Sequence, residues 1–267
     1  MLELARIESF KLRRGLAVKV MAGLTVLYAG LIVGVYKMME ILLDKTGTSL
    51  PPTPGVPMTF QMTGLTAFQF SDMYSMLQIF MMVLVASLYS SEYGRSTLKV
   101  MLVGGTRRSS LYLSKFLVLA GTLLGYALLG AILITALSAA VNGWGTSFEP
   151  IQLLRLAGAA VRVTALNMAY AAMLSLAAML TKSTGIVIAI GLGIQFSESM
   201  VITLLQMGNN AVLTFLSRLL PSGYAVPFAG QTVENAILLR GLGLSAILTA
   251  VFLCMGVWLF RKQDIPA

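Results

Sequence analysis

Residues 171–194, AAMLSLAAMLTKSTGIVIAIGLGI, hold two apolar runs that are joined by Lys182 and Ser183 alone. A helix of about 20 apolar residues crosses the hydrocarbon core of a bilayer. At their full lengths, 161–181 and 184–206, both runs reach that size. The stretch therefore predicts a tight hairpin of two membrane-spanning helices, and the expected fold class is an all-α integral membrane protein.

The rest of the chain extends this pattern. Of the 267 residues, 57% are hydrophobic, and the mean hydropathy is +0.85, which is more apolar than a soluble domain. We expect a single transmembrane domain over 18–260 with six membrane-spanning helices. The other four are predicted at about 18–37, 73–90, 114–140 and 237–260. A short interfacial helix is expected at 151–156, before the fourth span, and a tail at 261–267.

The N-terminal residues 1–19 predict an amphipathic helix of their own. At helical spacing its basic residues Arg6 and Arg13 lie outside an apolar stripe. That stripe is made of Leu2, Ala5, Leu12 and Leu16. Such a helix is expected to lie in the membrane interface, with its apolar face toward the lipid and its basic residues toward anionic headgroups.

The distribution of basic residues predicts the orientation in the membrane. Cytoplasmic segments carry an excess of Lys and Arg. Most of the 19 Lys and Arg residues fall in 1–19, in the loop 91–115 and beside the C-terminus. Both termini are therefore expected to be cytoplasmic, residues 38–72 are expected to face outward, and the expected location is the plasma (inner) membrane of a bacterium.

Several classes of function are excluded or disfavoured by composition. The chain has no histidine and one cysteine, Cys254, so histidine-based catalysis and zinc ligation are excluded. No GxxxxGK[ST] motif occurs, so the chain has no phosphate-binding P-loop of its own. The net charge is +9. The basic residues lie beside the predicted apolar spans, where membrane lipid is a better partner than nucleic acid. The 17 methionines suggest copper ligation, but methionine also packs in ordinary cores, and no metal site is expected.

The loop between the second and third spans has an unusual mixture of charges, glycines and apolar residues: SEYGRSTLKVMLVGGTRRSSLYLSK, residues 91–115. It resembles the first cytoplasmic loop of ABC-2-type transporter permeases. In that loop the pattern E-x-x-x-G-T-[LI]-[KR] is followed by a basic segment that leads into the next span and ends in Ser-Lys. Ser96 replaces the glycine of that pattern. The C-terminal FRKQDI, residues 260–265, is similar to the F-x-[KR]-x-D-[IL] ending of the same family. The matching loop residues are Glu92, Thr97, Leu98, Lys99, Arg107 or Arg108, Ser114 and Lys115.

This resemblance implies the permease subunit of an ATP-driven ABC exporter. In that family two permeases, identical or paralogous, form the substrate pathway, and the loop docks on separate cytoplasmic ATPase subunits. ATP and Mg²⁺ would then bind to the partner chain, and this chain would bind no cofactor and catalyse no reaction. The residues implied in ATPase coupling are Glu92, Arg95, Thr97, Leu98, Lys99, Arg107 and Arg108.

Glu198 is the one acidic residue deep in a predicted span. Carboxylates inside a membrane are costly and usually face a cavity, a partner or a transport pathway. Two interpretations stay open: a group in the pathway or at a dimer seam, and a structural hydrogen bond. Gln195, Asn167 and Gln78 are further candidates by the same reasoning, while Gly191 and Gly193 predict close helix packing.

Two other classes of function remain as alternatives. A stand-alone secondary transporter would need discontinuous helices in two repeated halves, and no internal repeat is evident. A membrane-embedded enzyme would need a cluster of reactive side chains, whereas the ten acidic residues are spread singly.

Overall fold

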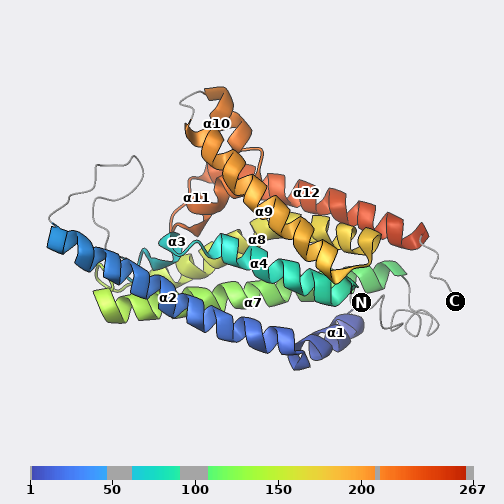
Figure 1. The fold of residues 1–267 in the computed structure, drawn as a ribbon, viewed down its shortest axis with the longest axis horizontal. Coiled ribbons are helices and arrows are strands. Elements are labelled where there is room, and N and C mark those ends of the chain that lie inside the picture. The colour runs from blue at the N-terminus through green and yellow to red at the C-terminus, as the bar shows by residue number, and fades with distance from the viewer. Residues whose placement is uncertain (1, 47–61, 91–107, 208–210, 263–267) are drawn as a thin grey trace.

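The computed structural model describes residues 2–46, 62–90, 108–207 and 211–262, and this part of the chain contains helices and no strand. The long helices, shown in Figure 1, are α2 (Leu16–Thr46), α4 (Met73–Val85) with its π-helical continuation η1 (Ala86–Ser90), α7 (Arg108–Asn142), α8 (Pro150–Thr181), α9 (Thr184–Met207) and α12 (Asn235–Lys262). The short ones are α1 (Leu2–Arg14), α3 (Ala67–Phe70), α10 (Ala211–Ser217), η2 (Pro221–Tyr224) and α11 (Ala225–Ala229).

Six helices in the described ranges are long and apolar enough to cross a membrane. They follow one another in the predicted order, and the all-helical fold is confirmed. The predicted hairpin is also present: α8 ends at Thr181 and α9 begins at Thr184. Lys182 closes the turn in a left-handed conformation, with φ of 53°, and its backbone N–H donates to Ala178 O over 3.0 Å.

Helix α8 lies at the centre of the bundle, where it contacts α4, α7, α9 and α12. Its buried face is rich in alanine, including Ala159, Ala160, Ala171, Ala172 and Ala178. Small side chains let neighbouring helices approach closely, which is typical of helix packing inside membranes.

The start of α8 differs from the prediction. The expected interfacial helix at 151–156 is wrong, because these residues form the first turns of a continuous α8 that begins at Pro150. A capping box fixes this start: the Glu149 N–H donates to Gln152 Oε1 over 3.1 Å, and Trp144 Nε1 donates to the same oxygen over 2.6 Å. Such a cap satisfies amides that would otherwise lack partners.

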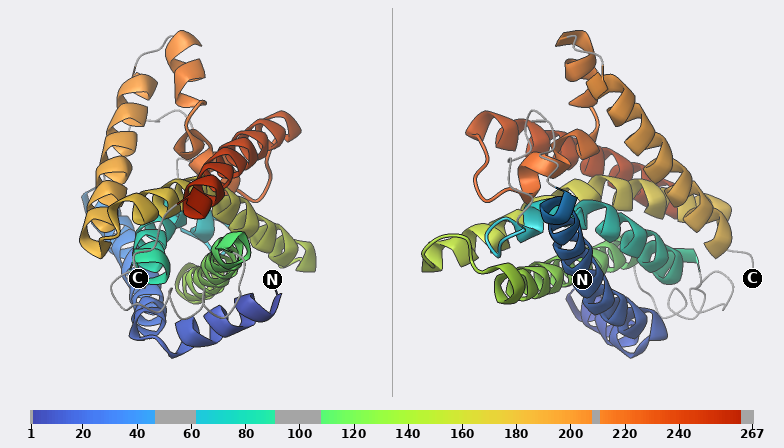
Figure 2. Two further views of the ribbon diagram at one scale, coloured as in Figure 1. Left: turned by 90° about the vertical axis from the view of Figure 1, so that its right-hand side faces the viewer. Right: turned by 60° about the vertical axis from the view of Figure 1, so that its left-hand side comes forward.

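The boundary between α1 and α2 also differs from the prediction. The predicted helix 1–19 ends instead at Arg14, and Gly15 separates it from α2. The predicted lipid-facing stripe is wrong in two respects, because Leu12 is buried in the core of the bundle and Leu16 belongs to the next helix, α2. The break at Gly15 places Leu16 on a helix with another direction. In the left view of Figure 2, α1 (dark blue) lies along the lower side of the bundle, at an angle to α7.

The packing of α12 on the bundle depends on a glycine. Gly256 is buried, and a Cβ atom there would overlap the ring and hydroxyl of Tyr112. Tyr112 is itself 1% exposed and hydrogen-bonded to Ser175 Oγ over 2.7 Å. No space is therefore left for a larger residue at 256.

We expect Gly256→Ala to lower the free energy of unfolding by about 1–3 kcal/mol, because Tyr112 must move to admit the methyl group. Gly243→Ala on the same helix is the matched control, since nothing lies within 4 Å of its added Cβ. Alanine there should be neutral or stabilising by up to about 1 kcal/mol. Unfolding of both variants in one detergent measures the difference, and equal midpoints would contradict this packing.

Candidate functional site

A buried carboxylate lies where four elements meet. Glu198 of α9 is 7% exposed, and it accepts hydrogen bonds from the Tyr170 hydroxyl of α8, the Gln78 amide of α4 and the backbone N–H of Ser222 in η2. Together with Tyr74 of α4, these residues are named the Glu198 cluster. In the chain segments that the structure describes, no lysine or arginine forms an ion pair with Glu198.

The geometry of the cluster satisfies both carboxylate oxygens. Glu198 Oε1 accepts from Tyr170 Oη and from the Ser222 amide at 3.2 Å. Glu198 Oε2 accepts from Gln78 Nε2 at 3.4 Å, and the same Nε2 donates to Tyr74 Oη over 3.2 Å. Buried carboxylates are stabilised by such donors when no counter-charge is near.

Helical spacing explains how the cluster assembles. Tyr74 and Gln78 are four residues apart on α4, and Gly191, Gln195 and Glu198 share one face of α9, since residues three and four apart are neighbours on a helix. At Gly191 a Cβ would overlap the Met82 side chain of α4, whereas nothing lies within 4 Å at Gly193. Close packing is therefore confirmed at Gly191 and wrong at Gly193.

A narrow cavity adjoins the cluster between α4, α8 and α9. It is lined by Gln78, Tyr170 and Gln195 together with three methionines, Met81, Met82 and Met173. Gln195 Nε2 also donates to Ser75 O of α4 over 3.3 Å. The lining of the cavity therefore combines three polar side chains with flexible thioether side chains, which adapt readily to a neighbouring group.

Three of the four predicted polar residues are brought together. Gln78 bonds Glu198, and Gln195 lines the adjoining cavity. Asn167 is fully buried but stays apart: its Nδ2 donates to Val163 O of its own helix over 3.0 Å, and its Oδ1 accepts no hydrogen bond from the described residues.

Residues 26–266 match the model of a family described as protein of unknown function (DUF2705). The chain belongs to this family. No curated protein matches the sequence. The matched part of this DUF2705 member contains the whole Glu198 cluster, whereas α1 precedes it.

Most of the predicted coupling residues of this family member lie outside the described residues. These are Glu92, Arg95, Thr97, Leu98, Lys99 and Arg107. Arg108 is described: it is the first residue of α7, and its Nη1 donates to Phe260 O near the end of α12 over 3.5 Å. The predicted third span, 114–140, therefore starts earlier as a helix than the sequence indicated.

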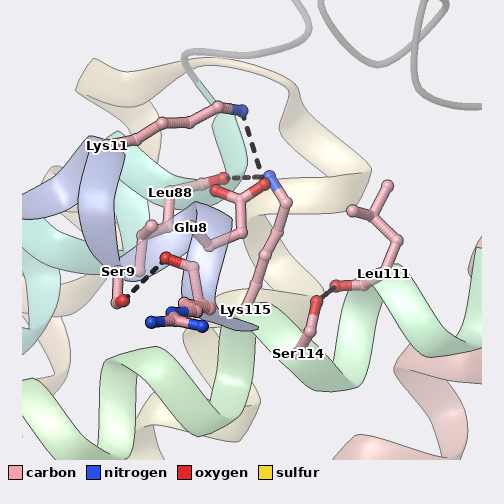
Figure 3. A network of polar contacts seen from close by, with 8 residues as sticks. Glu8, Ser9, Lys11, Leu88, Leu111, Ser114 and Lys115 are labelled. Atoms are coloured by element: carbon pink, nitrogen blue, oxygen red, sulfur yellow. Dashed lines mark hydrogen bonds and ion pairs between the residues drawn. The ribbon is translucent and has the colours of Figure 1, made fainter. Parts of the chain in front are cut away.

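A second polar network, shown in Figure 3, lies beside the end of η1. Glu8 and Lys115 are each 2% exposed, and Figure 3 shows the Glu8 carboxylate and the Lys115 ammonium pointing toward one another. Lys115 Nζ donates to Leu88 O over 2.7 Å, and Lys11 Nζ lies 3.5 Å from Glu8 Oε1. This network joins α1, η1 and α7.

Neither network resembles a metal centre. No group of three or more His, Cys, Asp or Glu side chains that could hold a metal ion occurs in the described ranges. What the Glu198 cluster offers chemically is a desolvated carboxylate whose hydrogen-bond partners Gln78 and Tyr170 line a small cavity between helices. Such a group can accept a proton or face a cationic or hydrogen-bonding ligand.

Proposed function

We propose that this chain is the permease subunit of an ATP-driven ABC exporter, embedded in the bacterial plasma membrane with both termini in the cytoplasm. The observation that carries the proposal is the set of six apolar helices, taken with the resemblance of residues 91–115 to the coupling loop of ABC-2-type permeases. The chain has no P-loop, so ATP and Mg²⁺ are assigned to separate ATPase subunits.

The arrangement around the ends of residues 91–107 supports this assignment. On one side, Leu88 of η1 accepts a hydrogen bond from Lys115 of α7. On the other, Arg108 contacts α12 at Phe260. The segment thus leaves and re-enters the bundle at elements that are tied to α1, α7 and α12. Force applied to a docked loop would reach these helices directly, as coupling requires.

The Glu198 cluster is proposed to belong to the substrate pathway or to the seam with a second permease. Glu198 lies fourteen residues after Thr184, or about 21 Å along the helix at 1.5 Å per residue. In the proposed orientation this is the outer half of the bilayer. Opening a pathway between α4, α8 and α9 would break hydrogen bonds to Glu198. Binding of a substrate to Glu198 would therefore favour the conformation in which these helices are apart.

Capture of partners from native membranes tests the proposed function. We expect a P-loop ATPase to co-purify with the wild-type chain, and the chain alone to hydrolyse no ATP. Glu92→Ala should weaken this association strongly, because truncating one partner of a desolvated charge pair costs about 2–5 kcal/mol.

The matched control is Glu234→Ala, an exposed acidic residue just before α12 that the proposal places on the opposite face of the membrane. It should leave the association unchanged. Absence of any co-purifying ATPase, or equal association of both variants, would contradict the coupling proposal.

A further inference from the structure

The outward face of α1 carries a basic and aromatic surface. Phe10 is 56% exposed and lies at its centre, and the Arg14 guanidinium carbon lies 4.4 Å from the centre of the Phe10 ring. Arg6 and Arg13 are exposed on the other side of Phe10, and Glu3 is the one acidic residue on this face. Arg6, Phe10, Arg13 and Arg14 are named the α1 basic face.

The opposite side of α1 fixes the direction of this surface. Leu12 is 9% exposed and lies in the hydrophobic core, and Glu8 is 2% exposed and points toward Lys115 of α7, the helix on which α1 packs (Figure 3). A half-turn of the helix separates Glu8 from Phe10, since successive residues are 100° apart. Because Glu8 and Leu12 hold the helix, Phe10 and its arginines point away from the bundle.

A second cation–aromatic pair lies at the same end of the molecule. Lys262 Nζ of α12 lies 4.3 Å from the centre of the Trp258 ring, which is 58% exposed. Phe260, between them, is bonded by Arg108 at the start of α7, the helix on which α1 packs. Exposed tryptophan beside a basic residue at a helix end is typical of the membrane–water interface.

We propose that the α1 basic face binds the headgroups of anionic phospholipids. This side of α1 carries three arginines and one glutamate, so its net charge is positive and complementary to anionic headgroups. The exposed Phe10 provides the apolar contact that an interfacial helix inserts below the headgroups. A soluble acidic partner would satisfy the charges but would leave the exposed Phe10 ring without an apolar contact. The inference requires insertion in a bilayer and is independent of ATPase coupling.

Site-specific fluorescence quenching by lipid tests the proposal. The full chain, with Cys254→Ser and Ile7→Cys, is labelled with bimane at position 7 and reconstituted in nanodiscs. Ile7 is 51% exposed and neighbours Phe10 and Arg14 on the helix. Brominated phosphatidylglycerol should quench at least about twofold more than brominated phosphatidylcholine at equal mole fraction, because basic residues attract anionic lipid. This preference should disappear in ~1 M NaCl, where the Debye length is about 3 Å.

Two controls make the result specific. Arg6→Gln, Arg13→Gln and Arg14→Gln together should abolish the preference for phosphatidylglycerol while quenching itself persists. A label at Ile247, 65% exposed in the middle of α12, should be quenched equally by both lipids. If the triple variant folds poorly, the salt titration of the parent chain decides.

Three outcomes would overturn the proposal. Equal quenching at position 7 by the two lipids would mean lipid contact without selection of anionic headgroups. Absence of quenching by either lipid would mean that the α1 basic face is turned to the aqueous phase or covered by a protein. A parent-chain preference that survives high salt would equally exclude an electrostatic origin.

Discussion

Replacing Glu8 with alanine is expected to lower the free energy of unfolding by about 3–5 kcal/mol, because it leaves the buried Lys115 ammonium without the carboxylate that points toward it, and an uncompensated buried charge costs about this much. Glu8 and Lys115 are both 2% exposed and point toward one another (Figure 3). Without the carboxylate, the Lys115 ammonium would keep Leu88 O and the Tyr89 ring, 5.8 Å from its Nζ, but would lose the opposite charge that faces it.

Glu3→Ala is the matched control for this prediction. Glu3 lies on the same helix but is exposed, so its removal should change the free energy of unfolding by at most about 0.5 kcal/mol. Unfolding of both variants in the same detergent gives the comparison. If Glu8→Ala and Glu3→Ala unfold alike, Glu8 does not hold α1 against α7.

A double-mutant cycle separates charge pairing from packing. Lys115→Met leaves Glu8 buried without the ammonium and should also destabilise. The double variant Glu8→Ala with Lys115→Met combines the two single substitutions and removes both charges, so that neither buried charge is left uncompensated. We therefore expect the double variant to lose less free energy of unfolding than the two single variants lose together. Strict additivity would show that the two residues act independently.

The six long apolar helices were predictable from the sequence, because long apolar runs depend on local composition alone. Their ends were less predictable. The run 161–181 is apolar enough to be recognised, but α8 begins at Pro150 because Glu149 and Gln152 form a capping box. Similarly, Gly15 divides α1 from α2, although helical spacing continues through it. Helix ends depend on individual hydrogen bonds that a hydropathy pattern does not contain.

The candidate site was partly predictable, for a related reason. Glu198 and Gln78 stand out as polar residues in apolar runs, and they do meet. Tyr170 and Tyr74 gave no such signal, because tyrosines in apolar runs usually serve as aromatic packing. Ser222 contributes a backbone N–H, which any residue type could supply. Asn167 is likewise a polar residue in an apolar run, but it bonds its own helix. A pattern of polar residues does not show toward which neighbour a side chain points.

Glu198→Ala is expected to lower the free energy of unfolding by about 2–4 kcal/mol. The substitution removes the acceptor shared by Tyr170, Gln78 and the Ser222 amide. A buried donor left without its acceptor costs about 1–3 kcal/mol, and such losses are not additive within one cluster. Ser199→Ala is the control, because Ser199 is exposed on the same helix and its hydroxyl donates to Gln195 O of that helix, outside the Glu198 cluster. Similar unfolding of the two variants would show that the cluster does not join α9 to η2.

Glu198→Gln then distinguishes hydrogen bonding from charge. The glutamine oxygen can still accept from Tyr170 and Ser222, and Gln78 can present its own oxygen to the new amide after rotation. Stability should therefore remain within about 1 kcal/mol of the wild type. If the carboxylate serves the proposed pathway, this stable variant should nevertheless lose substrate-stimulated ATPase activity in the assembled transporter, because only the negative charge has been removed. A glutamine variant with wild-type stimulation would assign Glu198 to structure alone, joining α4, α8, α9 and η2 by hydrogen bonds without contacting the substrate.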